Sequence, residues 1–146
     1  MAKQKDRLPQ FTPLLHRTLD SPAWLALSPY AKALYPALKR RTGAHGAKNG
    51  RASMSVREAA EYLGCNKNTA GKAFADLQAK GFAIPRTIGT LGTAGMGNAT
   101  EWRLPELGTP ENLTPTREFE HWQPGHDLPV RRGKTSKSAA KKRNPV

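Results

Sequence analysis

Apolar residues recur at helical spacing in three stretches of this 146-residue chain. The first covers residues 30–41, where one side of a helix would carry Ala31, Leu34, Tyr35 and Leu38. Because Pro36 falls inside this stretch and lacks a backbone donor, we expect a kink or a break there. Ser21-Pro22 and Ser28-Pro29 each predict a helix start, since serine caps a helix and proline suits its first position.

The other two helical stretches follow each other closely and have clear boundaries. Ser55 and Glu58 match a capping box, in which the two side chains satisfy backbone donors at a helix start. Gly64 predicts the end of that helix, since glycine readily adopts the left-handed conformation found there. Asn66 is expected to cap the next helix, and Gly81 to close it. Its buried side would carry Ala70, Ala73, Phe74 and Leu77.

The remaining apolar pattern predicts short strands at residues 51–54, 82–88 and 99–104. Pro85 confines the second of these to an edge or a bulge, because it cannot donate to a neighbouring strand. The glycine-rich residues 89–98 would form the hairpin tip between the last two strands. Two helices, a turn, a third helix and then a two-stranded ribbon predict a winged helix-turn-helix over residues 11–108. This fold is mainly α with a small β-wing.

Composition and charge change outside that domain. We expect residues 1–10 to be a flexible basic arm, residues 109–129 a proline-rich acidic linker, and residues 130–146 a disordered polybasic tail. The net charge is +13 for the chain, with −4 over residues 104–129 and +7 over residues 130–146. A basic excess of +3 also remains over residues 51–103, so the charge favours a polyanionic partner for the domain itself.

Several classes of function find no support in the sequence. Cys65 is the only cysteine, which excludes an internal disulfide and favours a reducing compartment. No apolar run is long enough for a membrane span or a secretory signal, so we expect a cytoplasmic, nucleoid-associated protein with no membrane partner. We recognise no catalytic group, nucleotide-binding loop or metal-ligand spacing. The chain is therefore expected to be no enzyme, with no cofactor, metal or small-molecule effector.

The helix predicted at residues 67–80 carries side chains suited to DNA. With Ala70 at the centre of the buried side, Asn68 and Lys72 project together on the opposite side near the N-terminal end. Asparagine can bond bidentately to adenine, and lysine can reach guanine or phosphate. We therefore expect the N-terminal half of this helix to enter the major groove. The expected DNA-binding residues are Ser55, Arg57, Asn66, Lys67, Asn68, Thr69, Gly71, Lys72, Arg86 and Arg103.

Most of these residues are assigned to phosphate. The helix starts at residues 55–57 and 66–69 would offer free backbone N–H groups, with Arg57 and Lys67 adding charge. Arg86 and Arg103 flank the predicted hairpin tip. Gly71 costs about 1 kcal/mol relative to alanine in a helix interior, and either allows close backbone approach to DNA or is incidental. Each single cation could equally be a solvated surface charge. Their convergence around one helix favours an interface.

Residues 55–82, "SVREAAEYLGCNKNTAGKAFADLQAKGF", resemble the winged-helix DNA-binding domains of GntR-type and related bacterial regulators. The likeness lies in Ala60, Gly64, Thr69-Ala70, Ala73, Leu77 and Gly81 at the family's spacing. More loosely, residues 21–104 resemble small bacterial helix-turn-helix proteins of plasmids and other mobile elements. The resemblance implies DNA binding through residues 55–72. The chain departs from the family pattern at Cys65, Asn66 and Gly71.

These observations predict a sequence-specific protein for double-stranded DNA, most simply a bacterial transcription regulator. Three alternatives stay open: a replication or partition factor of a mobile element, a basic RNA-binding winged-helix protein, and an adaptor in which only the tail binds nucleic acid. The sequence also leaves open whether the protein forms a homodimer.

Overall fold

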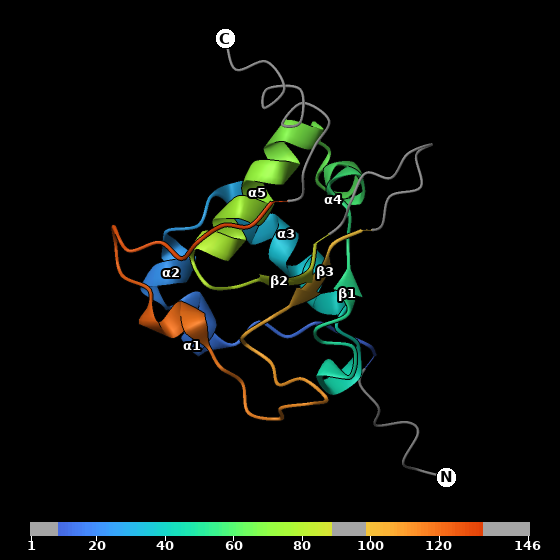
Figure 1. Cartoon of the computed structure of the whole chain (residues 1–146), viewed down its shortest axis with the longest axis vertical. Coiled ribbons are helices and arrows are strands. Elements are labelled where there is room, and N and C mark those ends of the chain that lie inside the picture. The colour runs from blue at the N-terminus through green and yellow to red at the C-terminus, as the bar shows by residue number, and fades with distance from the viewer. Residues whose placement is uncertain (1–8, 89–98, 133–146) are drawn as a thin grey trace.

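The computed structural model of the chain describes residues 9–88 and 99–132. Within these residues it contains five α-helices and a three-stranded antiparallel sheet (Figure 1). The predicted hairpin tip at 89–98 lies outside the described residues, as do residues 1–8 of the predicted arm and the tail from residue 133. None of the helices in the described ranges is both long and apolar enough to cross a bilayer.

The helices begin where the capping residues predict. Helices α2 (Pro22–Leu25) and α3 (Pro29–Arg40) each start with a proline, and the serine before it accepts a backbone hydrogen bond. Helix α4 (Val56–Leu63) has the predicted capping box and is followed by Gly64 in the left-handed conformation. Helix α5 (Lys67–Ala79) is capped by Asn66, whose Oδ1 accepts from the Thr69 amide at 2.8 Å. The four-residue helix α1 (His16–Leu19) was not predicted.

Pro36 does not break α3, so of the kink or break predicted there the break does not occur. The helix continues without interruption to Arg40, and Leu34, Tyr35 and Leu38 on its inner side are completely buried. Burying a side chain of this size stabilises by about 1.5–3 kcal/mol. Three such residues outweigh the roughly 3 kcal/mol that an interior proline costs, so tertiary packing decides the conformation here.

The sheet has the strand order β1-β3-β2 and packs beside the helices. Strand β3 (Glu101–Arg103) lies in the middle, and its Trp102 pairs with Ala52 of β1 (Ala52–Ser53). Strand β2 (Ile84–Thr87) forms one edge, and its register shifts between Pro85 and Thr87. Pro85 therefore lies on an edge strand beside a bulge, as its missing donor requires.

Aromatic side chains join the helices to the sheet. Phe74 of α5 stacks on Trp102 of β3, with ring centroids 4.9 Å apart and planes only 3° from parallel. Trp24, Tyr35 and Phe82 meet edge to face at 5.5–5.6 Å. These contacts fix the orientation of α5 relative to the sheet, because rings packed this closely have few alternative arrangements.

Residues 109–129 pack on this core, which corrects the prediction of a linker. Phe119, in a short 3₁₀ helix (Glu118–His121), is 1% exposed and stacks on Phe82 at 4.8 Å. Trp122 is also buried in the core. Gly81 adopts φ +85°, and a Cβ there would lie 2.7 Å from the backbone nitrogen of Phe119. Glycine is therefore required at this helix end by packing as well as by its backbone conformation.

A buried charge pair lies on the inner side of α3. The Glu106 carboxylate forms an ion pair with Lys39, and both side chains are almost fully buried. The same carboxylate accepts hydrogen bonds from the hydroxyl groups of Thr18 and Tyr35, the latter at 3.1 Å. Burial, together with the negative charge of Glu106, raises the pKa of Tyr35 well above its usual value. Residues from three separate segments thus satisfy one buried charge.

Asn49 fastens the loop after α3 to the chain that leaves β3. Its Oδ1 accepts from the Leu104 amide at 2.7 Å. Its Nδ2 lies 3.0–3.1 Å from the carbonyl oxygens of Leu104, Leu107 and Gly108. A buried amide can stabilise a loop only when its polar atoms are satisfied in this way.

Candidate nucleic-acid interface

The N-terminal half of α5 presents an exposed polar stripe. Lys67, Asn68 and Lys72 are exposed and Gly71 is half-buried. The opposite side of the helix is buried in the core through Ala70, Ala73, Phe74 and Leu77. The structure thus divides α5 into the two sides that the helical spacing predicts. Both proposed base-reading side chains reach solvent.

A groove of about 360 Å³ runs along this stripe. It lies between α5, the first residue of α4, the base of the sheet and the segment that contains Arg131 and Arg132. Four of its lining residues are cations, Lys67, Lys72, Arg131 and Arg132. Among the described residues that line the groove there is no Asp or Glu. A concave surface whose charged side chains are all positive favours a polyanionic partner.

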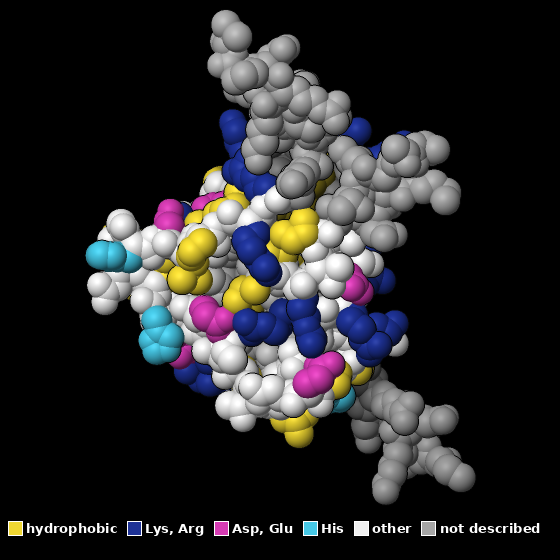
Figure 2. Space-filling view, in the orientation of Figure 1, with side chains coloured by type: hydrophobic (Ala, Val, Ile, Leu, Met, Phe, Trp, Pro, Cys, Tyr) yellow, Lys and Arg dark blue, Asp and Glu magenta, His cyan; other side chains and the backbone are white. Residues whose placement is uncertain are grey.

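Lys and Arg side chains also extend beyond the groove. Figure 2 shows them over α5 and the neighbouring sheet, with patches of apolar surface between them. Acidic side chains are interspersed mainly over the lower half of the view. Lys and Arg side chains also lie in that lower half, so positive charge on this face is not confined to the surroundings of α5.

The N-terminal end of α5 is better suited to bind a phosphate group than the N-terminal end of α4. Helix geometry leaves the Lys67 and Asn68 amides without an intrahelical acceptor, and no acidic residue lies in the first turn of α5. The start of α4 instead holds Glu58, whose carboxylate pairs with Arg41 at 2.7 Å. The hydrogen bond from Arg41 lowers the pKa of Glu58, so this carboxylate is charged near neutral pH.

This arrangement changes the roles expected for Ser55 and Arg57. The Ser55 hydroxyl accepts from the Glu58 amide at 3.1 Å, beside a negative charge, so we no longer place a phosphate on it. Arg57 is well exposed and makes one long ion pair with Glu61, at 3.6 Å. A surface pair of this kind contributes little, so Arg57 remains free to bind a phosphate instead.

Two arginines of the sheet, Arg86 in β2 and Arg103 in β3, are engaged with residues 109–118. Arg103 donates to the Thr116 hydroxyl at 2.7 Å and forms an ion pair with Glu118 at 2.8 Å, with its side chain only 22% exposed. We therefore withdraw Arg103 from the proposed interface. Arg86 makes a longer contact, 3.5 Å, to Glu111 at the surface. Neither contact follows from the sequence, which predicts a linker at residues 109–129.

Arg131 and Arg132 are the lining residues that the sequence placed in a disordered tail. They end a segment, residues 127–132, that we call the C-terminal strap. The strap crosses α5 in Figure 1, where it is coloured orange to red. The Gln78 side chain accepts from the Arg131 amide and donates to its carbonyl, both at 2.9 Å. A polar Gln78 beside the predicted buried side of the helix is a sequence feature that indicates a backbone partner.

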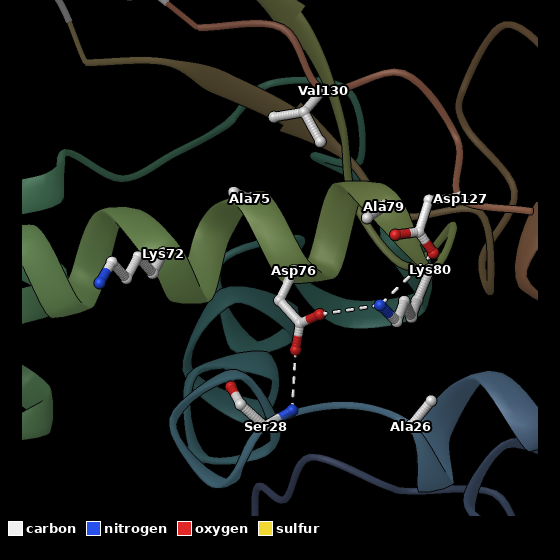
Figure 3. A pocket seen from close by; sticks show the side chains of 9 residues that line it. All are labelled: Ala26, Ser28, Lys72, Ala75, Asp76, Ala79, Lys80, Asp127 and Val130. Atoms are coloured by element: carbon white, nitrogen blue, oxygen red, sulfur yellow. Dashed lines mark hydrogen bonds and ion pairs between the residues drawn. The ribbon is translucent and has the colours of Figure 1, made fainter. Parts of the chain in front are cut away.

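A second hollow, on the other side of the strap, contains the one acidic residue of α5. Asp76 accepts from the Ser28 amide at 2.7 Å and pairs with Lys80 at 3.3 Å (Figure 3). Lys80 also pairs with Asp127 of the strap, at 3.4 Å. In the same view, Lys72 extends toward the N-terminal end of α5, away from Asp76. The charge of Asp76 is therefore balanced inside the fold.

Comparison of the chain with models of protein families, with curated proteins and with solved structures gives no match. The described residues also contain no group of three or more His, Cys, Asp or Glu side chains that could hold a metal ion. The function is therefore inferred from the geometry and charge of the groove.

Proposed function

We propose that this chain is a winged helix-turn-helix protein that binds double-stranded DNA, with the N-terminal half of α5 in the major groove. The observation that carries the proposal is the groove lined by Lys67, Lys72, Arg131 and Arg132 with no acidic side chain among its described lining residues. The order of elements supports the architecture. Helices α4 and α5 meet at a tight turn through Gly64, and two antiparallel strands follow.

The exposed stripe of α5 suits a major groove in shape as well as charge. A B-DNA major groove is about 12 Å wide and admits an α-helix. Gly71 lies on the stripe, and a Cβ added there would meet no described atom within 4 Å, so internal packing does not require glycine. The absence of a side chain at Gly71 would let the bases approach the helix backbone closely. Asn68 and Lys72 flank it with the amide and ammonium groups that read adenine and guanine edges.

Phosphates would be held at the N-terminal end of the helix. Lys67 is exposed there beside the free amides of the first turn, and Asn66 retains its amide nitrogen after its oxygen caps the helix. Arg57 lies on the preceding helix. Phosphate contacts of this kind fix the position of a helix, while base contacts determine the sequence that it recognises.

A helix as the reading surface favours duplex DNA over RNA. The major groove of A-form RNA is deep and narrow and does not admit protein side chains on a helix. Competition between duplex DNA, single strands and structured RNA of equal length tests this choice. Preferential displacement by RNA would contradict the proposal.

Transcription regulation is the cellular role that we propose. A regulator of this size would bind one site or a short palindrome near a promoter. A replication or partition factor of a mobile element would bind tandem repeats instead. Sequencing the genomic DNA bound by the protein distinguishes the two arrangements.

Replacing Lys72 with alanine is expected to weaken binding to a selected duplex about tenfold or more, which corresponds to about 1.4 kcal/mol. The side chain is exposed, so the melting temperature should not fall. Fluorescence anisotropy with a labelled duplex measures the affinity. Lys48→Ala, which removes an exposed lysine outside the groove, is the matched control. Equal losses in the two variants would mean that only net charge matters.

A further inference from the structure

We infer that the C-terminal strap, residues 127–132, is a third element of the nucleic-acid interface and holds Arg132 against backbone phosphates beside α5. The inference rests on the proposed function and deepens it, because neither the helix nor the wing supplies this contact. It assigns a binding role to a segment that, in the sequence, is marked only by a proline and by charged residues.

The strap is attached to the domain at both of its ends. At its start, the indole N–H of buried Trp122 donates to Asp127 at 2.8 Å. The Leu128 amide then donates to the carbonyl of Ala79 at 2.9 Å, at the C-terminal end of α5. At its other end, Gln78 holds both backbone polar groups of Arg131. The strap is thus a fixed part of the fold up to the last described residues.

The hydrogen bond from Trp122 lowers the pKa of Asp127, and the charge of Lys80 adds to the effect. The carboxylate therefore stays charged at neutral pH and keeps its contact with Lys80. The Asp127 side chain is 53% exposed, so this pair adds only modestly to the hydrogen bonds that position the strap over α5.

The two arginines of the strap have different surroundings. The Arg131 guanidinium donates to the carbonyl oxygen of Pro85 in β2, so this side chain ties the strap to the sheet. The Arg132 side chain is exposed and has no hydrogen bond or ion pair within the described part of the chain. It also lines the groove that contains Lys67 and Lys72. Arg132 is therefore a cation with room for a phosphate.

The position of the strap also favours phosphate over bases as its partner. It passes from α5 to β2, between the helix proposed to enter the major groove and the strands of the wing. A DNA backbone that borders the groove would run along this line, and the phosphate and sugar groups of the backbone receive at least about half of all protein–DNA hydrogen bonds. Beyond Arg132 the sequence has five more Lys or Arg residues and no Asp or Glu. The strap therefore joins a further basic segment to the domain at the groove.

A blocking role fits the same contacts less well. The strap covers the C-terminal end of α5, where Gln78 and Ala79 are buried. Asn68 and Lys72, which would read bases, remain exposed. A segment that kept DNA away would have to cover those residues.

Two variants of the full-length chain test the inference on the duplex used for Lys72→Ala. Arg132→Ala removes the cation and leaves the strap attached. We expect about threefold to tenfold weaker binding, and a slope of log affinity against log salt that is smaller by about 0.9, as for one lost phosphate contact. Gln78→Leu removes the two hydrogen bonds that hold the Arg131 backbone and loosens that end of the strap without changing the charge, so we expect about threefold weaker binding. Lys48→Ala again controls for net charge.

The outcomes separate this inference from the proposed function. If Lys72→Ala weakens binding but Arg132→Ala behaves like Lys48→Ala, the strap is not part of the interface and the inference is overturned. Tighter binding by Gln78→Leu would overturn it too, because the strap would then be a cover. If Arg132→Ala weakens binding while Lys72→Ala does not, the docking of α5 fails and the strap contact stands.

Discussion

Replacing Glu106 with alanine is expected to lower the free energy of unfolding by about 3–5 kcal/mol. The Glu106 and Lys39 side chains are 1% and 4% exposed, and the ammonium group would lose its charged partner without gaining water. A buried charge without a partner costs far more than the pair contributes. Domains of this size are stable by only about 5–15 kcal/mol, so a large share of the stability should be lost.

Urea unfolding followed by circular dichroism measures this loss. Glu111→Ala is the control, because Glu111 pairs with Arg86 only at the surface, and its midpoint should match the wild type. The double variant Lys39→Met with Glu106→Gln should recover much of the stability, since neither residue then carries a charge. A loss below about 1 kcal/mol for Glu106→Ala would contradict the buried pair.

Replacing Phe119 with alanine is expected to cost about 3–5 kcal/mol, the usual range for a buried phenylalanine. Phe119 is 1% exposed and stacks on Phe82, so its removal leaves a cavity in the core. The backbone of Phe119 also lies against Gly81, which limits how far the site can collapse around the cavity. The effect would establish that residues beyond 108 stabilise the domain.

Leu113→Ala provides the comparison for Phe119. Leu113 lies in the same segment but is 84% exposed, and its replacement should leave the unfolding midpoint unchanged. If the segment were a linker, both variants would be as stable as the wild type. Equal and small effects would therefore refute the packing of residues 109–132.

The sequence predicted those parts of the fold that are determined by neighbouring residues. The helix ends were predicted because each capping residue has its partners within four residues. These residues are the Ser55–Glu58 pair and Gly64 of α4, and Asn66 of α5. The exposed position of Asn68 and Lys72 followed from the spacing of Ala70 and Leu77 alone. Pro85 was placed correctly because its missing donor excludes a central strand at any position.

The parts that were missed depend on contacts between distant residues. Glu106 and Lys39 look like ordinary surface charges until α3 and the chain after β3 come together. Phe119 and Trp122 lie between prolines with no helical or strand period, so nothing marked them as core residues. Of the kink or break predicted at Pro36, the break does not occur because burial outweighs a local preference.

The candidate site likewise contains residues that local sequence predicts and residues that only distant contacts bring there. The helix residues were predicted from local spacing, whereas Arg131 and Arg132 enter the groove only because Gln78 holds the strap. Arg103 was assigned to phosphate because its partners, Thr116 and Glu118, belong to the segment that was taken for a linker. Charges near a site can be assigned only once all packed segments are known.

The most direct test is an amide chemical-shift titration of the isotope-labelled protein with a selected duplex. The proposed docking predicts the largest changes at residues 66–72, smaller changes at residues 131 and 132, and none along α1 and α2. Changes confined to residues 133–146, with residues 66–72 unaffected, would contradict the binding of DNA through α5.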